Sequence, residues 1–357
     1  MNLGIIGLPQ VGKKTVFQLL TGLSAEKAPT KDGIVHGIAS VRDPRVDKLS
    51  AMYSPKRTKY AEFEVDLPPD IMPDSGRSAA WLEPMRHTDA FVHVVRAFES
   101  ENVYHILNSV DANRDIETVD LEFLFADLAM TEQRIERLKK DMRLKPTQQK
   151  ELELAVIERC HAQLEAEQPL RNLEFTEEEM KLIRSLQFLT LKPMLTVLNV
   201  GEDLKSEEAK YASLAEKLRA RGDTVIFLSA AIEEELSEMS ADEQAAFMED
   251  LGLTEPASHR LSRAAYQCLG LISFFTCGPD EVKAWPLTAG STAPEAAGKI
   301  HTDLQRGFIR AETIAYDELM KAGSEKAARE AKLFKLNGKE YIVQDGDIIE
   351  IRFNVSK

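Results

Sequence analysis

The residue types best suited to chemistry lie near the start of the chain. The segment Gly7-Leu8-Pro9-Gln10-Val11-Gly12-Lys13 has the glycine and lysine spacing of a phosphate-binding P-loop. An apolar run, Leu3 to Ile6, precedes it, and residues with helical spacing, Thr15 to Leu20, follow it. In such a loop the backbone N–H groups converge on phosphate oxygens, and the lysine bridges the β and γ phosphates. We therefore predict a nucleoside triphosphate site whose phosphate contacts come from Gly7, Gln10, Val11, Gly12, Lys13, Lys14 and Thr15.

The position after the loop lysine departs from this pattern. A serine or threonine hydroxyl normally stands there and binds magnesium, whereas this chain has Lys14, whose ammonium group cannot be a metal ligand. Thr15 comes one residue later and is turned by about 100° around the helix. Two outcomes are open: the Lys14 charge partly replaces that of the metal, or the site does not bind a triphosphate with magnesium.

The elements around the loop indicate an α/β domain. Short apolar runs rich in β-branched and aromatic residues recur along the first 230 residues, separated by helical or loop stretches, and this alternation is typical of a mostly parallel sheet. These predicted strands are Leu3 to Ile6, Tyr60 to Val65, Ala90 to Val95, Met194 to Leu198 and Thr224 to Leu228.

A helical hairpin is predicted between two of these strands. From Asp120 to about Leu186 the sequence is rich in Glu, Lys, Arg, Gln and Leu, with apolar residues at helical spacing. Pro146 interrupts the pattern, and a second helix is expected from Gln148 to Leu164. We interpret this pair of helices as a scaffold or a partner-docking arm rather than a catalytic element.

The C-terminal part has a different sequence pattern, of short predicted strands separated by turns. Short strands are expected at Leu271 to Thr276, Ala284 to Leu287, Lys332 to Leu336, Tyr341 to Val343 and Ile348 to Asn354. Asn337-Gly338 and Asp345-Gly346 are turn signals between them. A compact β-rich module is the expected result.

Composition limits the partners. A chain of 357 residues with 43% apolar and 29% charged residues predicts a folded protein of two or three domains. Its net charge of -14 argues against a surface that coats nucleic acid everywhere. From Ile272 onwards there are 12 Lys or Arg against 13 Asp or Glu, so this nearly neutral segment is the better candidate for RNA contact.

The cysteines, the histidines and the apolar runs predict no further site. Cys160, Cys268 and Cys277 form no CxxC pair, which indicates neither a disulfide framework nor a zinc site, and fits a reducing cytoplasm. The histidines form no His-x3-His pair, so no histidine metal site is expected. No apolar run approaches the ~20 residues of a membrane span. We expect a cytoplasmic protein without membrane contact; its oligomeric state is not indicated.

Beyond these local patterns, the sequence resembles the YchF branch of the Obg-like ATPases from end to end. The resemblance implies a P-loop NTPase domain (residues 1–119 and 189–270), an inserted α-helical hairpin (120–188) and a C-terminal, β-grasp-like TGS domain (271–357). The stretches that carry it are GLPQVGKKT (7–15), SVRDPRVDKL (40–49), HVVRAFE (93–99), FLTLKPMLTVLNVGE (188–202), AWPLTAGSTAPEAAGKIHTDLQRGFIRAETIAY (284–316) and YIVQDGDIIEIRFNV (341–355).

The resemblance also implies how a base is read. Ordinary GTPases recognise guanine with an Asn-Lys-x-Asp motif, whereas the YchF family carries Asn-x-x-Glu, and this chain has Asn199-Val200-Gly201-Glu202. ATP is therefore expected over GTP, with GTP still a possible ligand, Asn199 as the loop organiser and Glu202 near the base edge. Ser229 and Ala230 match the last base-contacting loop of the family.

A second departure from the family concerns the switch loops. Where the family has Asp-x-Ala-Gly, this chain reads Asp66-Leu67-Pro68-Pro69. Asp66 is retained as an outer-sphere partner of magnesium, but Pro69 has no N–H to give to the γ-phosphate. Residues Met72 to Ser78 lack the repeated glycines of a mobile loop, and Thr30 is the candidate for the magnesium-binding threonine of the first switch.

Two functions follow from these observations. The first is an ATP-binding, translation-associated protein in which hydrolysis is weak or lost, because a metal hydroxyl and a γ-phosphate donor are both missing. The second is a pseudo-NTPase that acts as a ribosome- or protein-binding scaffold without turnover. TGS domains in related proteins associate with ribosomes or RNA, and Lys332, Lys335 and Lys339 could meet phosphates or simply protect an edge strand.

Overall fold

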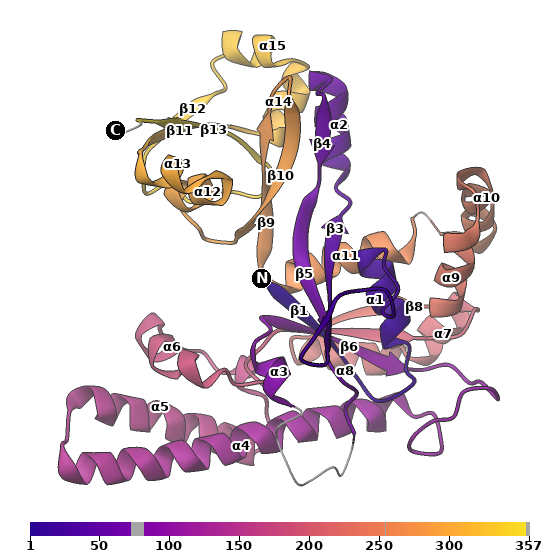
Figure 1. Ribbon diagram of the computed structural model, residues 1–357, viewed down its shortest axis with the longest axis vertical. Helices are drawn as coiled ribbons and strands as arrows, with labels where there is room; N and C mark the ends of the chain where they lie inside the picture. Colours follow the sequence, from indigo (N-terminus) through magenta and orange to yellow (C-terminus); the bar gives the residue numbers. More distant parts are fainter. Residues whose placement is uncertain (73–81, 254, 355–357) are drawn as a thin grey trace. The chain divides into compact units, whose positions relative to one another are not determined.

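The computed structural model describes residues 1–72, 82–253 and 255–354 (Figure 1). The chain forms two compact units, Met1–Gly37 with Glu64–Ser258, and Ile38–Phe63 with His259–Lys357. The chain leaves the first unit within strand β3 (Ile34–Val41) and returns to it within β5 (Ala61–Leu67). The three-domain division of the sequence analysis stays a prediction.

The first sheet confirms the α/β class. Its seven strands lie in the order β2-β3-β5-β1-β6-β7-β8, and β1 pairs in parallel with both β5 and β6. β6 also pairs in parallel with β7, and β7 with β8, whereas β2 and β3 are antiparallel. The strands not bounded above are β1 (Asn2–Ile6), β2 (Thr30–Lys31), β6 (Ala90–Arg96), β7 (Met194–Asn199) and β8 (Thr224–Leu228).

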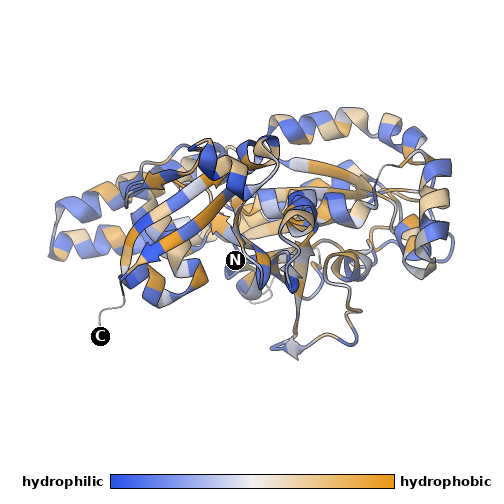
Figure 2. Cartoon of the chain, turned by 90° about the horizontal axis from the view of Figure 1, so that it is seen from above, coloured by the Kyte–Doolittle hydropathy of each residue, from blue (hydrophilic) through white to orange (hydrophobic). Residues whose placement is uncertain are grey.

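The central strands of this sheet are buried on both faces. Every residue of β6 and β7 is buried, as a strand covered by helices on both sides requires. Figure 2 shows apolar colour along these strands and alternating apolar and polar colour along the two longest helices. The accompanying helices are α1 (Lys13–Thr21), α3 (Glu83–Arg86), α7 (Leu204–Lys210), α8 (Ala212–Ala220), α9 (Ala230–Glu238) and α10 (Ala241–Leu251).

The predicted helical hairpin is present, and its first helix is longer than expected. Helix α4 (Ala112–Leu144) begins eight residues before Asp120, because the Asp111 carboxylate caps it by accepting from the Arg114 N–H. Thr147 caps the start of α5 (Gln148–Glu165) in the same way. Leu138 on α4 packs with Ile157 and Cys160 on α5 in one buried cluster. The remaining short helices of this region are η2 (Leu170–Asn172), α6 (Glu177–Ile183) and η3 (Arg184–Leu186).

The second unit has a six-stranded sheet in the order β12-β11-β13-β9-β10-β4. Small residues of helix α12, Ala293, Ala296 and Ala297, let that helix pack closely on Phe274 and Ile349 of the sheet. The strands are β4 (Arg57–Lys59), β9 (Leu271–Cys277), β10 (Glu281–Thr288), β11 (Phe308–Ala315), β12 (Lys335–Asn337) and β13 (Asp347–Phe353). The helices are α2 (Pro44–Tyr53), α11 (Ala257–Cys268), α12 (Ala293–Ile300), α13 (Thr302–Arg306), α14 (Tyr316–Ala322) and α15 (Glu325–Glu330).

Two sequence predictions for this unit were wrong in detail. The strand expected at Tyr341 to Val343 is an irregular segment with one isolated bridge, between Thr292 and Ile342. The strand expected at Lys332 to Leu336 is reduced to β12, since Lys332 adopts a φ of 56° that ends the preceding helix. No helix among the described residues is long and apolar enough to cross a membrane.

Arg45 joins helix α2 to the C-terminal strands within the second unit. Its guanidinium lies 2.7 Å from Asp345 and 2.8 Å from Asp43, and it stacks over the Phe275 ring at 5.2 Å. Burial alone would lower the pKa of Arg45, but its hydrogen bonds to the two carboxylates raise it overall. This residue therefore anchors residues 38–63 to a segment 300 positions away.

We expect Arg45→Met to lower the free energy of unfolding by about 1–3 kcal/mol, because it removes charge-assisted hydrogen bonds to both aspartates. Urea unfolding of the full chain measures the change. Lys48→Met, on the exposed face of the same helix, is the matched control and should change stability by less than ~0.5 kcal/mol. Equal effects of the two substitutions would contradict this role of Arg45.

Candidate functional site

The phosphate loop lies between β1 and α1, at the carboxyl end of a central strand of the first sheet. Gly7 has a φ of 146° and Gly12 a φ of 101°, backbone conformations that favour glycine. A Cβ on Gly7 would lie 2.4 Å from the Val94 carbonyl oxygen, and one on Gly12 would lie 2.5 Å from the Asn199 amide nitrogen. Gly7 is therefore required by the close approach of the β6 backbone, and Gly12 by its positive φ and the nearby Asn199 side chain.

A cavity of about 830 Å³ opens over this loop, within the size range of small-molecule sites. Of the predicted residues, Gln10, Gly12, Lys13, Lys14, Thr15, Asn199 and Ala230 line it. Gly7, Val11 and Ser229 are buried beneath it, and Glu202 is exposed outside the lining. The lining residues that sequence reasoning did not assign are Gly33, Val35, Leu67, Pro68, Asp70, Phe98, Asn102, Val103, Ala231 and Glu234.

The loop lysine is buried and already holds an anion. Lys13 is 5% exposed, and its Nζ donates to the Gly7 and Leu8 carbonyl oxygens. The same Nζ lies 2.8 Å from an Asp70 carboxylate oxygen. Burial lowers the pKa of Lys13, and the Asp70 carboxylate opposes that shift. Asp70 is thus paired with the ammonium group that a bound phosphate would contact, so the two anions would compete for it.

Asn199 ties three segments together at the floor of the cavity. Its side-chain nitrogen donates to the Val11 carbonyl oxygen at 3.0 Å, and its side-chain oxygen accepts from the Ala230 N–H at 3.1 Å. Ser229 caps helix α9 next to this contact. One buried amide therefore joins the phosphate loop, the end of β7 and the start of α9, and the role of Asn199 in base binding stays a prediction.

Lys14 also lines the cavity, and it pairs with a surface carboxylate. Its Nζ lies 2.8 Å from Glu26, and the two side chains are 71% and 64% exposed. The hydrogen bond to Glu26 raises the pKa of Lys14. The ammonium group stays charged at neutral pH, so it cannot supply the oxygen ligand that a magnesium ion requires.

The other residues considered for magnesium have partners of their own. The buried Asp66 carboxylate accepts from the Asn2 side chain and lies 2.6 Å from His36 Nδ1. Thr30 is exposed on β2, outside the cavity lining. Over the described ranges, no group of three or more His, Cys, Asp or Glu is placed to hold a metal. Residues 73–78 of the expected switch loop lie outside the described residues.

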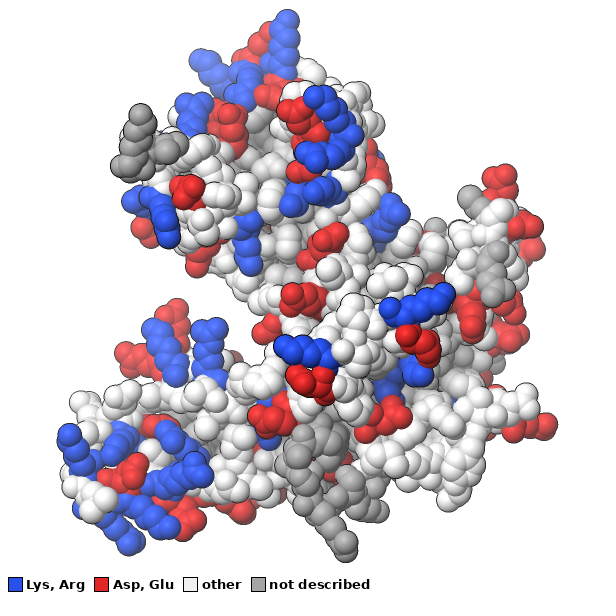
Figure 3. Space-filling model, viewed as in Figure 1, with Lys and Arg blue, Asp and Glu red and all other residues white. Residues whose placement is uncertain are grey.

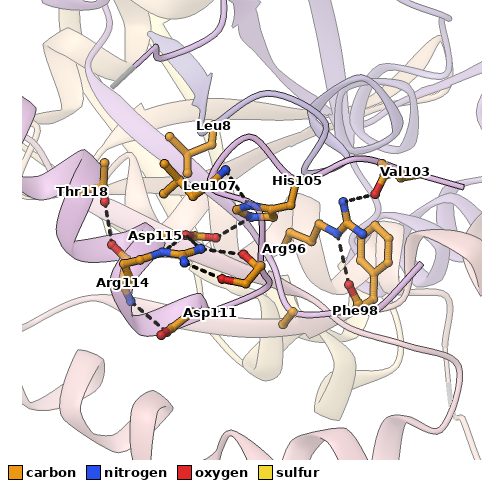
Figure 4. A network of polar contacts seen from close by, with 12 residues as sticks. Leu8, Arg96, Phe98, Val103, His105, Leu107, Asp111, Arg114, Asp115 and Thr118 are labelled. Carbon is orange, nitrogen blue, oxygen red and sulfur yellow. Dashed lines mark hydrogen bonds and ion pairs between the residues drawn. The ribbon is translucent and has the colours of Figure 1, made fainter. Parts of the chain in front are cut away.

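A buried arginine shapes another wall of the cavity (Figure 4). Arg96, at the end of β6, is 2% exposed and donates to the Phe98 carbonyl at 3.1 Å and the Val103 carbonyl at 3.0 Å. Its guanidinium also stacks over the Phe98 ring at 4.6 Å. Arg96 therefore fixes the loop that presents Phe98, Asn102 and Val103 to the cavity. The sequence signal was a charged residue at the end of an apolar strand.

The same loop is fastened to helix α4 by a buried His–Asp pair. His105 Nε2 lies 2.8 Å from Asp115, and His105 Nδ1 accepts from the Leu107 N–H at 3.1 Å (Figure 4). Because Nδ1 accepts a backbone proton, Nε2 carries the hydrogen that Asp115 accepts. The Arg114 guanidinium also binds Asp115, at 2.8 Å. Helix α4 therefore begins at a polar network that reaches the cavity wall.

Comparison with known proteins gives matches that carry YchF or Obg-like names. The family model described as YchF-GTPase_C, protein of unknown function (DUF933), matches residues 271–354. The chain is 40% identical to the ribosome-binding ATPase YchF of Bacillus subtilis (strain 168), over 99% of the chain and 100% of that protein. It is 36% identical to Obg-like ATPase 1 of Oryza sativa subsp. japonica, over 100% of the chain and 93% of that protein. The solved structure of the Schizosaccharomyces pombe YchF GTPase superposes with a TM-score of 0.84 at 30% identity, covering 99% of this chain and 97% of that one.

We expect Asp70→Asn to tighten nucleotide binding about two- to fivefold, because phosphate then no longer competes with a half-exposed carboxylate for Lys13. Calorimetric titration with a non-hydrolysable ATP analogue measures the change. Glu64→Gln removes an exposed carboxylate from strand β5 and serves as the control, with affinity expected to stay within about twofold. Unchanged affinity in Asp70→Asn would mean that Asp70 does not compete with phosphate.

Proposed function

The chain belongs to the YchF family of Obg-like ATPases, and on that premise we propose an ATP-binding, ribosome-associated protein in which nucleotide hydrolysis is weak or lost. The observation that carries nucleotide binding is the buried Lys13 at the floor of a cavity of about 830 Å³, held in a loop that Asn199 fastens. A buried ammonium group needs an anion, and a phosphate is the anion that this loop geometry suits.

The preference for ATP over GTP rests on the base-reading motif. In this chain Glu202 stands at the position of the guanine-reading aspartate in the Asn-Lys-x-Asp motif of ordinary GTPases, and Val200 replaces the lysine of that motif. Asn199 keeps its structural bonds to the Val11 carbonyl and the Ala230 N–H. The site therefore retains the organiser of the base pocket, while the carboxylate at the guanine-reading position is one methylene longer and lies exposed outside the cavity lining. On these grounds GTP is the weaker of the two ligands.

Weak hydrolysis is proposed from two residues that line the cavity. Lys14 replaces the hydroxyl that binds magnesium, and Pro69 has no N–H to donate to a γ-phosphate. Loss of one preorganised donor in a transition state typically slows a reaction ~100-fold or more. With both contacts missing, the cavity can bind a triphosphate while lacking the main means of stabilising its transfer.

Association with the ribosome is proposed from the relatives. The Bacillus subtilis protein is named a ribosome-binding ATPase, and this chain matches it over its whole length. A cytoplasmic location follows from that partner. The second candidate is a pseudo-NTPase scaffold that binds the ribosome or a protein without turnover, and the pairing of Asp70 with Lys13 is the observation in its favour.

Calorimetric titration with non-hydrolysable ATP and GTP analogues, each with magnesium and with chelator, separates the two candidates. We expect the ATP analogue to bind at least about tenfold more tightly than the GTP analogue, with little dependence on magnesium. Tighter binding of the GTP analogue would overturn the proposed base preference. Absence of binding by either analogue would leave the scaffold as the function.

Restoring a hydroxyl at position 14 tests the role of the metal. We expect Lys14→Ser to make nucleotide affinity depend on magnesium, by a factor of about ten between metal and chelator, since a serine oxygen can complete the metal's ligands. Lys14→Ala is the matched control, because it removes the ammonium without adding a ligand. Identical affinities with and without chelator in Lys14→Ser would contradict this prediction.

A further inference from the structure

One short segment carries a net positive charge in an otherwise acidic chain. Residues 134–150, here called the hairpin tip, carry seven Lys or Arg and two Asp or Glu, a net charge of +5 in a chain whose net charge is -14. The other 340 residues therefore carry -19. The basic residues of the hairpin tip are Arg134, Arg137, Lys139, Lys140, Arg143, Lys145 and Lys150.

The hairpin tip lies at the far end of α4 and α5, where Lys145 to Thr147 connect the two helices. Helix α4 meets strand β6 near Phe123, whose ring packs on Phe91 at 5.1 Å. At 1.5 Å per residue, the end of α4 is about 30 Å along the helix from that contact. Figure 3 shows Lys and Arg gathered at this end of the two helices. The charge is thus carried on an arm away from the sheet.

Some of these cations have partners and others do not. Arg134 pairs with Glu153, Lys139 with Glu158 and Lys140 with Glu136. Arg137, Arg143 and Lys145 are exposed, and no carboxylate of the described chain lies within ion-pair distance of them. Three exposed cations are therefore available to an anionic partner.

The lysines of the C-terminal unit give a weaker net positive charge than the hairpin tip. Lys332, Lys335 and Lys339 are exposed, but Glu330 and Glu340 flank them, so residues 330–340 carry a net charge of only +1. The nearby Arg329 and Arg352 both pair with Glu312. A polyanion would therefore be attracted more strongly to the hairpin tip than to this part of the sheet.

We propose that the hairpin tip binds the phosphate backbone of RNA, and that it is the surface through which this protein contacts ribosomal RNA. The contact with ribosomal RNA rests on the proposed ribosome association. A narrow helical arm bearing unpaired Lys and Arg suits phosphates, which it would contact without reading sequence. Leu144, 87% exposed between Arg143 and Lys145, is a single apolar side chain, too little for stable insertion into a membrane.

Two triple variants of the full chain separate the two basic surfaces. The tip variant carries Arg137→Gln, Arg143→Gln and Lys145→Gln, and the matched control carries Lys332→Gln, Lys335→Gln and Lys339→Gln. All six residues are exposed, so circular dichroism should be unchanged in both. Binding to a fluorescent 24-base-pair RNA duplex is measured by anisotropy over a series of KCl concentrations, and binding to purified ribosomes by co-sedimentation.

We expect the tip variant to lose at least about tenfold in affinity for both probes, and the control to stay within about twofold. The slope of log affinity against log salt should fall by roughly 2–3 in the tip variant, since three phosphate contacts are lost. Equal binding by the tip variant and the unmodified chain would overturn the proposal, as would a larger loss in the control. Tip-dependent binding to phosphatidylglycerol vesicles without RNA binding would reassign the surface to membranes.

The two probes distinguish failure of this proposal from failure of the proposed function. Tip-dependent binding of the duplex without ribosome binding would remove the ribosome association and leave the RNA-binding surface. Ribosome binding that is unaffected in the tip variant would remove the surface and leave the association. If the unmodified chain bound neither duplex nor ribosome, both would be overturned.

Discussion

A buried lysine that requires an anion is the constraint around which the first unit is organised. Lys13 is almost fully enclosed, and burial works against its charge. The loop meets this constraint with two carbonyl oxygens and one carboxylate. The two glycines allow the strands to approach closely enough to enclose the lysine, and Asn199 holds the loop in that conformation. The parallel strands on either side of the loop thus help to hold the Lys13 ammonium group in place.

The departures from the family pattern are concentrated near that ammonium group. Pro69 and Asp70 follow β5 and line the same cavity as Lys14, and Asp70 supplies the anion that a nucleotide would otherwise supply. A loop of this kind can still exchange a carboxylate for a phosphate, because both are oxygen anions. The proposal of weak hydrolysis rests on two groups that would favour a transition state over a bound ground state, a magnesium-binding hydroxyl at position 14 and an N–H donor at position 69, for which this chain has Lys14 and Pro69. Retained binding with reduced turnover is the combination that these residues support.

The parts of this account that were predictable from sequence are local in the chain. The P-loop was expected from its motif, and strands were expected at Ala90 to Val95 and Met194 to Leu198 from their apolar sequence. Each strand is one residue longer in the structure. The assignment of residues 38–63 to the C-terminal unit was not, because β4 pairs with β10 more than 220 positions away and is only three residues long. The partner of Lys13 was missed for the same reason: nothing around Asp70 indicates which cation it meets. The segment Tyr341 to Val343 has an apolar sequence typical of a strand, but in the structure it is irregular and forms one isolated bridge, from Ile342 to Thr292.

When a nucleotide binds, Lys13 is expected to exchange the Asp70 carboxylate for a phosphate. A crystal structure of the protein with a non-hydrolysable ATP analogue, grown without magnesium, tests it most directly. The account predicts phosphate oxygens at the Lys13 Nζ, the Asp70 carboxylate displaced from it, and Asn199 still bonded to the Val11 carbonyl and the Ala230 N–H. An analogue bound elsewhere, with Asp70 still paired to Lys13, would contradict it.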